Sequence, residues 1–267
     1  MRHISIPNQA PANGRTVGQY TKSPLRYPGG KSRAVKFILP FLPKAPGVLV
    51  SPFFGGGSVE LAAASLGWKV FGYDKYQPLI DFWQTVLTDP NGLADAVSNY
   101  YPLSTERFYQ LQRQEPFPTQ LAEAARYFVL NRASFSGTTM SGGMSLGHRR
   151  FTPSAIERVR NFKADNVRVE QADFAKSIAL NRNAFFYLDP PYYSATKLYG
   201  RRGDLHEGFF HDGLCQLLKS RDRWVLSYDD CREVREMYSG YRIFALDWKY
   251  GMSIDKKSRE ILIRSNE

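Results

Sequence analysis

The residues best suited to chemistry end the segment AFFYLDPPYY, where Asp189, Pro190, Pro191 and Tyr192 follow an apolar run. A run that is apolar at nearly every position predicts a buried strand, which would deliver Asp189 to the ligand-binding edge of a sheet. The two prolines hold the backbone so that its carbonyl groups cannot join a hydrogen-bonded ladder. The segment therefore predicts a rigid cluster of acceptors, made of the Asp189 carboxylate and nearby carbonyl groups.

Such a cluster suits one kind of reaction at a nucleobase. An exocyclic amino group is a poor nucleophile, because its lone pair is delocalised into the ring. Asp189 and the Pro190 carbonyl could hold both amino hydrogens and favour a more tetrahedral nitrogen, aimed at a methyl sulfonium. Tyr192 would stack on the base, a contact worth about 1–3 kcal/mol. The alternative is a strand-ending turn that carries a surface tyrosine.

A glycine loop, SPFFGGGSVEL, is the candidate cofactor site. Gly55, Gly56 and Gly57 leave room for a ligand against the backbone at the carboxyl end of a strand. Asp74 ends the next strand, where a carboxylate can accept hydrogen bonds from two ribose hydroxyls. The loop lacks GxGxxG, which suits a cofactor without a pyrophosphate, such as S-adenosylmethionine (SAM). Taken alone, an ordinary tight turn explains this loop at least as well.

The stretch PLRYPGGKSR has the appearance of a loop that binds the phosphates of a nucleoside triphosphate. That motif requires a glycine six residues before the lysine and an apolar strand in front of the loop. Leu25 stands where the glycine should be, and the preceding GRTVGQYTKSP is not an apolar strand. The triphosphate interpretation is therefore excluded.

The elements that must position these residues follow from apolar periodicity. Strands are predicted at 47–50, 69–73, 167–170, 184–188 and 224–228, and helices at 32–42, 59–66, 79–87 and 212–219. Strand, glycine loop, helix, strand and acid in this order make one half of a nucleotide-binding sheet. The last two apolar runs, RIFALDW and EILI, predict an antiparallel pair of strands.

The alternation of strands and helices stops between about residues 90 and 164. A helix is predicted at 121–134, followed by the polar, glycine-rich run SFSGTTMSGGMSLGHRR. Thr152 and Pro153 suit an N-cap followed by proline at the first helical position, so a further helix should start there. We interpret this region as an insertion that projects from the sheet.

Composition limits the partners. A formal net charge of +11 and a pI of about 9.6 favour a polyanion such as nucleic acid, although simple solubility also explains them. The sequence contains no run of 18 apolar residues, so it predicts no membrane span. The two cysteines are too few for a disulfide framework or a zinc site, no histidines have metal-ligand spacing, and a reducing cytoplasm is the expected setting.

Taken together, several segments resemble the Dam-type adenine-specific DNA methyltransferases of the alpha group. These are RYPGGKS, SPFFGGGSVEL, YDKYQPLIDFW, NRASFSG and FFYLDPPYY. The resemblance extends from Ser23 nearly to the C-terminus. It implies an α/β fold, with a Rossmann-like SAM-dependent methyltransferase sheet whose last strand is antiparallel, and a mainly helical DNA-recognition insertion. A flexible tail is expected at 1–22, the SAM-binding catalytic domain at 23–90 and 165–267, and the target-recognition insertion at 91–164.

The resemblance also implies roles for single residues. Tyr27 and Lys31 would pack on and bond to the cofactor, with Lys31 reaching its carboxylate end, although better-known members have tryptophan near the position of Tyr27. Asp173 would contact the adenine ring of SAM, and a helix N-cap explains that residue equally well. The expected cofactor-binding residues are Tyr27, Lys31, Phe54, Gly55, Gly57, Asp74, Asp173 and Asp189, and the expected catalytic residues are Asp189, Pro190 and Tyr192.

Double-stranded DNA is the expected partner. The amino group of a paired adenine is buried in the duplex, so the base must be flipped out at a cost of about a few kcal/mol. The candidate DNA contacts are Asn131, Arg132, Arg149 and Arg150 in the insertion, and Lys197, Arg201 and Arg202 in the loop after Tyr192. For arginines in a basic protein, phosphate contacts are more common than base contacts, and a solvated basic loop explains the second group equally well.

The resulting hypothesis is a site-specific DNA adenine methyltransferase that transfers methyl from SAM to the N6 amino group of a flipped adenine. We expect a metal-independent monomer in the cytoplasm; whether a cognate restriction enzyme accompanies it is left open. Two alternatives are kept. One is a SAM-dependent methyltransferase that acts on cytosine N4 or on RNA, and the other is a catalytically silent DNA-binding protein on the same scaffold.

Overall fold

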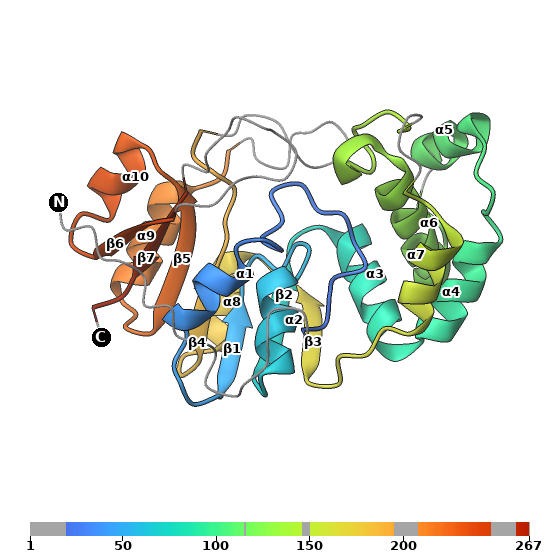
Figure 1. Ribbon diagram of the computed structural model, residues 1–267. Helices are drawn as coiled ribbons and strands as arrows, with labels where there is room; N and C mark the ends of the chain where they lie inside the picture. The colour runs from blue at the N-terminus through green and yellow to red at the C-terminus, as the bar shows by residue number, and fades with distance from the viewer. Residues whose placement is uncertain (1–19, 115, 146–149, 195–207, 247–259, 267) are drawn as a thin grey trace.

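A twisted sheet forms the centre of the protein in the computed structural model, which describes residues 20–114, 116–145, 150–194, 208–246 and 260–266. Within these residues seven strands pair in the order β3-β2-β1-β4-β5-β7-β6 (Figure 1). The strands are β1 (Val48–Ser51), β2 (Lys69–Asp74), β3 (Val167–Gln171), β4 (Phe185–Leu188), β5 (Trp224–Asp229), β6 (Arg242–Leu246) and β7 (Glu260–Arg264).

The five strands from β3 to β5 run parallel, whereas β7 is antiparallel to both β5 and β6. Every residue of β4 and of β5 is buried, as expected for strands covered on both faces. The predicted α/β class, with an antiparallel last strand, is therefore confirmed. The order reverses between β1 and β4, and in open sheets such a switch point leaves a crevice beyond the carboxyl ends of the strands.

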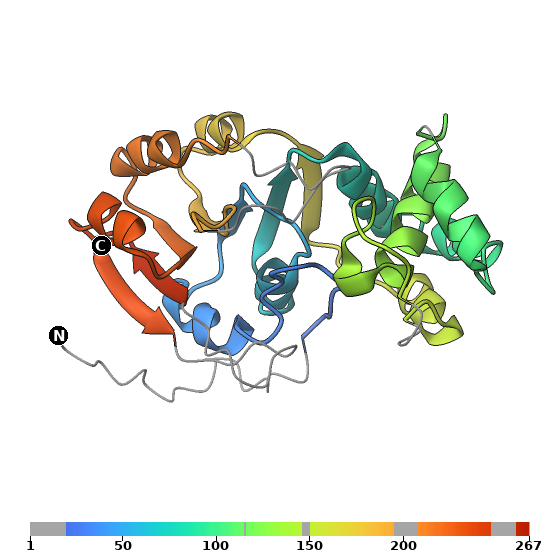
Figure 2. The same cartoon turned by 90° about the horizontal axis from the view of Figure 1, so that it is seen from above.

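Helices cover both faces of the sheet. On one side lie α1 (Val35–Ile38), η2 (Leu39–Phe41), α2 (Ser58–Ser65) and α3 (Gln77–Thr88), and on the other lie α8 (Phe174–Leu180), α9 (His211–Lys219) and α10 (Arg232–Met237). Figure 2 shows α8 and α9 across the sheet from α1 and α2. Neighbouring residues of one strand point into different cores: Leu49 packs with the first group and Val50 with the second. The α-helix in this region is shorter than the predicted 32–42. It covers only Val35–Ile38, because the chain passes into the 3-10 helix η2, which contains Pro40.

A group of helices lies beside β3 at one end of the sheet (Figure 1). It contains α4 (Pro90–Ser98), α5 (Thr105–Arg113), α6 (Gln120–Ala133), the short η3 (Phe135–Gly137) and α7 (Pro153–Arg160). Helix α6 packs on α3, which packs on β3, so the helical group shares a core with the sheet. The predicted start of α7 is confirmed, because Ala155 N donates a hydrogen bond to Thr152 Oγ1 and Pro153 is the first residue.

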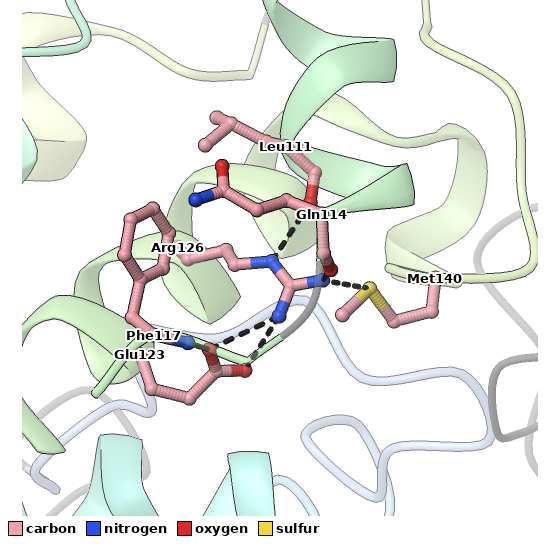
Figure 3. A network of polar contacts seen from close by, with 6 residues as sticks. All are labelled: Leu111, Gln114, Phe117, Glu123, Arg126 and Met140. Carbon is pink, nitrogen blue, oxygen red and sulfur yellow. Dashed lines mark hydrogen bonds and ion pairs between the residues drawn. The ribbon is translucent and has the colours of Figure 1, made fainter. Parts of the chain in front are cut away.

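A buried arginine joins α6 to the end of α5 (Figure 3). Arg126 is 1 % exposed, and its Nε and Nη2 donate to the carbonyl oxygens of Leu111 and Gln114, each at 2.7 Å. Its Nη1 bonds both carboxylate oxygens of Glu123, and the Phe117 N–H also donates to Glu123. The charge of Arg126 is thus satisfied entirely by neighbours, which is the condition for burying it.

No helix in the described part of the chain has the length and apolar character needed to cross a bilayer.

Candidate active site

A cavity of about 340 Å³ opens at the carboxyl ends of the parallel strands, close to the switch point between β1 and β4. Its wall contains all the residues that the sequence assigned to cofactor binding or catalysis. They are Tyr27, Lys31, Phe54, Gly55, Gly57, Asp74, Asp173, Asp189, Pro190 and Tyr192. Five segments that are far apart in the sequence therefore meet at one place. The fold explains this, because each segment follows a strand that ends at this edge of the sheet or packs against such a segment.

The segment around Tyr27 lies directly on the glycine loop. A Cβ atom at Gly55 would stand 2.9 Å from the Tyr27 ring, and one at Gly56 would stand 2.6 Å from the Tyr27 Cβ. Gly55 also has φ +48°, a conformation that other residues rarely adopt. Only glycines allow this contact, so the two motifs RYPGGKS and SPFFGGGS form one unit beside the cavity.

Asp74 fixes the same loop from the other side. Its carboxylate accepts hydrogen bonds from Gly55 N at 3.0 Å and from Tyr76 N at 3.1 Å. Burial raises the pKa of Asp74, and the Tyr76 and Gly55 N–H groups act in the opposite direction. Asp74 therefore holds the glycine loop in place while it faces the cavity.

Lys31 and Asp189 form the centre of the site. Lys31 is 4 % exposed, and its Nζ lies 2.8 Å from Asp189 Oδ1 and 3.1 Å from the carbonyl oxygen of Gly29. In the structure this ammonium pairs with Asp189, because a buried cation requires a nearby anion. A contact between Lys31 and the carboxylate end of the cofactor stays a prediction. Asp189 itself is 21 % exposed and can be reached from the cavity.

Burial and charge together tune Asp189. Burial raises the pKa of Asp189 to about 6, Lys31 opposes this rise, and the carboxylate of Glu260 adds to it. Burial lowers the pKa of Lys31, but the attraction of Asp189 and Glu260 outweighs that effect and leaves the value raised. At neutral pH the arrangement therefore keeps an ionised carboxylate beside an ammonium group.

Three carboxylates around the Asp-Pro-Pro-Tyr turn were missed by the sequence interpretation. Glu60 accepts a hydrogen bond from the Ser51 hydroxyl at 2.7 Å, and burial raises its pKa to about 7. Glu260, the first residue of β7, accepts a hydrogen bond from the Tyr192 hydroxyl. Asp229, the last residue of β5, accepts from Tyr193 N and Ser194 N, both at 2.9 Å. For Asp229 the available signal was a charged residue at the end of an apolar run, whereas Glu60 and Glu260 carried no local signal.

An aromatic wall stands beside Asp173. The rings of Phe53, Phe174 and Phe209 lie 5.4–5.8 Å from one another between centroids, and all three line the cavity. Asp173 is the N-cap of α8, with its Oδ1 accepting from Lys176 N at 2.8 Å. The N-cap alternative is thus correct in itself, and a contact between Asp173 and the adenine ring of SAM stays a prediction.

Asn131 requires a correction. Its side chain is 0 % exposed, with Oδ1 accepting from Arg26 N at 2.8 Å and Nδ2 donating to the carbonyl oxygens of Arg26 and Gly137. Because its polar atoms are bonded to the protein and no part of it reaches the surface, this placement does not allow a DNA contact. Asn131 instead ties α6 to the segment that carries Tyr27.

The other candidate DNA contacts differ in their surroundings. Arg132 is 9 % exposed and donates to the carbonyl oxygens of Arg150 and Pro24. Burial, with the charges of Arg158, Arg26 and Arg150 nearby, lowers the pKa of Arg132 to about 10, so it stays charged. Arg150 is exposed. Arg149, Lys197, Arg201 and Arg202 lie outside the described residues.

The fold and the site together define a class of protein. A doubly wound sheet with an antiparallel seventh strand, a glycine loop after β1, an acid ending β2 and Asp-Pro-Pro-Tyr after β4 matches a Rossmann-like methyltransferase. A family model described as D12 class N6 adenine-specific DNA methyltransferase matches residues 27–252. The chain belongs to this family.

Two curated relatives are methyltransferases by name. The chain is 27% identical over 216 residues to modification methylase StsI of Streptococcus sanguinis, a match that covers 69% of this chain and 31% of StsI. It is 21% identical over 239 residues to type II methyltransferase M.CviBI of Paramecium bursaria Chlorella virus NC1A, covering 85% of this chain and 90% of that protein. The chain thus spans about a third of StsI and most of M.CviBI.

Proposed function

We propose that the protein is a site-specific DNA methyltransferase that transfers a methyl group from SAM to the N6 amino group of an adenine flipped out of duplex DNA. The observation that carries the proposal is the place of Asp189. It faces a cavity shared with a glycine loop and an aromatic wall, in a chain of the D12 class N6 adenine-specific family.

The residues present fit SAM. The cavity of about 340 Å³ lies within the size range typical of small-molecule sites. Phe53, Phe174 and Phe209 offer apolar surface for a flat ring, and Asp74 offers a carboxylate for hydroxyl groups. The glycine backbone at Gly55 supports a close approach. When bound, SAM would supply an electrophilic methyl group on a sulfonium.

The protein's own groups would prepare the amine. The Asp189 carboxylate and the Pro190 carbonyl would each accept one amino hydrogen of the target base, which directs the nitrogen lone pair away from the ring. The ring of Tyr192 would stack on the base and hold it outside the duplex. No general base is required, because the ammonium group formed by the transfer is acidic enough to lose its proton to water.

DNA binding would use the basic surface of the chain. The net charge of +11 supports a polyanionic partner. We propose that residues 91–164 form the target-recognition region, and that Arg150 contacts DNA phosphates, together with Arg149, Lys197, Arg201 and Arg202. Arg132 would support Arg150 through its hydrogen bond to the Arg150 carbonyl.

The names of the two relatives describe modification and type II enzymes. These names support a DNA-modification role for this chain as well, with a cognate restriction enzyme as a partner to be sought. Action as a monomer and a cytoplasmic location stay predictions.

Nucleoside analysis of methylated DNA tests the proposed function. The purified protein is incubated with SAM carrying a labelled methyl group and unmethylated duplex DNA, and the product is digested and separated. We expect label in N6-methyladenine. Label in N4-methylcytosine, or transfer to RNA alone, would show that the substrate is wrong, and DNA binding without any transfer would support the catalytically silent alternative. The control is Asp222→Ala, an exposed aspartate in the turn before β5, which should keep full activity.

A further inference from the structure

The antiparallel direction of β7 brings an additional carboxylate to the active site. In the parallel strands the carboxyl ends meet at the cavity, whereas β7 runs the other way and its first residue reaches the same edge. That residue is Glu260, and its register partner on β5 is Asp229. The end of β5 and the start of β7 therefore place two carboxylates side by side next to the Asp-Pro-Pro-Tyr turn.

Glu260 is bonded to the side chain of the turn's tyrosine. It is 2 % exposed, and its Oε1 accepts the hydrogen bond of the Tyr192 hydroxyl and lies 3.8 Å from Lys31 Nζ. Lys31 Nζ also stands 4.9 Å from the centroid of the Tyr192 ring. The hydroxyl and one face of this ring are thus both engaged, and the ammonium stabilises the buried charge of Glu260.

Asp229 holds the backbone that follows the same tyrosine. Its two oxygens accept from the N–H groups of Tyr193 and Ser194. Asp229 therefore fixes the main chain that follows Tyr192, and Glu260 fixes the hydroxyl end of the Tyr192 side chain. Anchoring at both ends defines the orientation of an aromatic ring, and a ring held in advance binds a base without the cost of ordering it.

We propose that Glu260 is a positioning residue, which holds the Tyr192 ring in the orientation required to stack on the flipped target base. The inference rests on the proposed function. Glu260 acts through Tyr192 and does not touch the reacting atoms. The hydroxyl of Tyr192 then serves as the anchor of the ring, and its hydrogen bond to Glu260 is the interaction that couples β7 to base binding.

A double-mutant cycle on kcat/KM for DNA tests this coupling. Tyr192→Phe removes the hydroxyl, and Glu260→Met removes the acceptor while keeping a side chain of similar volume. We expect each change to lower kcat/KM for DNA by about 10- to 100-fold, as for loss of a hydrogen bond to a charged group. We expect Tyr192→Phe to have no further effect, within about twofold, when Glu260→Met is already present. Equal effects of Tyr192→Phe in both backgrounds would overturn the inference.

Glu260→Gln is a second, independent test of the positioning role, and it applies even if Glu260→Met does not fold. Glutamine keeps an acceptor for the Tyr192 hydroxyl, so kcat/KM should stay within a few fold of the unaltered protein. Because Glu260 raises the pKa of Asp189, its neutralisation should also move the acid limb of the kcat profile to lower pH. A loss as large as that of Tyr192→Phe would contradict the inference.

Two controls separate this inference from its premise. Glu233→Ala, an exposed glutamate on α10, should leave kcat/KM unchanged. If the unaltered protein transfers no methyl group to DNA, the proposed function fails and the positioning role fails with it. If the unaltered protein is active and the cycle is additive, only the role of Glu260 is wrong.

Discussion

Asp189 combines two conditions that oppose each other. Burial favours its neutral form, and the ammonium of Lys31 at 2.8 Å favours its charged form. The balance places the pKa at about 6, well above the ordinary value for aspartate. The carboxylate is thus ionised at neutral pH, yet it takes up a proton under mildly acidic conditions.

Activity should therefore fall on the acid side. A raised pKa means that the ionised fraction of Asp189 decreases as the pH drops through about 6, and a protonated carboxyl is a poorer acceptor for the amino hydrogens. We expect kcat to decline with one proton between about pH 7 and pH 5, where the DNA is still a duplex. Steady-state methyl transfer as a function of pH measures this. A constant kcat down to pH 5 would contradict the prediction.

The motifs at the cavity could be predicted at this scale because their signals are local. A buried strand followed by Asp-Pro-Pro-Tyr, and three glycines before an acid, are visible in short stretches of sequence. Glu60 and Glu260 had no such signal, because only tertiary packing brings them to Asp189. The assignment of Asn131 to DNA was wrong because a polar residue in a basic region can equally be buried by backbone partners.

Removing the Asn131 side chain should lower the stability of the fold and leave the electrostatic contacts of the protein with DNA unchanged. Asn131→Ala breaks the three hydrogen bonds of a buried side chain and leaves the Arg26 backbone without these partners, so we expect a loss of about 2–4 kcal/mol in the free energy of unfolding. Urea unfolding measures this change, and the exposed Asn161→Ala is the matched control. An unaltered unfolding midpoint together with a weaker salt dependence of DNA binding would instead support the contact to DNA.

Among the elements, the strands were predicted well and their order was not. Continuous apolar runs mark β4 and β5, and the separated runs near the C-terminus mark β6 and β7. The position of β7 between β5 and β6 follows from packing, which local patterns do not encode. Helices α4, α5 and α10 were missed, and α8 was foreseen only in the N-cap alternative for Asp173. Helix α5 is largely polar and buries only Phe108 and Leu111.

The connection between α5 and α6 depends on Arg126. Arg126→Ala leaves Glu123 as a buried charge without its partner, so we expect a loss of about 3–5 kcal/mol in the free energy of unfolding. The double variant Arg126→Met with Glu123→Leu should lose less, because it removes both charges and keeps the volume. Urea unfolding compares the two, with exposed Arg107→Ala as control. A single variant more stable than the double variant would contradict this account of the network in Figure 3.

For the whole molecule, charge and shape predict how DNA is bound. The sheet ends in a cavity, a helical group lies beside β3, and the chain carries a net charge of +11. Composition alone indicated the polyanionic partner, and the sequence pattern indicated an insertion. The surface that meets DNA could not be derived in the same way, because it depends on which basic side chains the fold leaves exposed.

DNA affinity should depend steeply on salt. Each phosphate contact contributes a slope of about −0.9 to the logarithm of the binding constant against the logarithm of salt concentration. Arg150→Ala should make this slope less negative by about 0.9, the contribution of one phosphate contact, because Arg150 is exposed in the helical region. Fluorescence anisotropy with labelled duplex measures it, and exposed Arg182→Ala in the turn before β4 is the control. If Arg150→Ala left the slope unchanged and Arg182→Ala made it less negative, DNA would bind near Arg182 and the assignment of Arg150 would be wrong.

The central claim is that Asp189 prepares the adenine amine by accepting a hydrogen bond. The most direct measurement is single-turnover methyl transfer with SAM and DNA prebound, which excludes binding and product release from the observed rate. Asp189→Ala should slow the step by about 100- to 1000-fold, as for removal of one preorganised group at a reacting centre, while SAM and DNA still bind. A rate within about threefold of the unaltered protein would contradict the account.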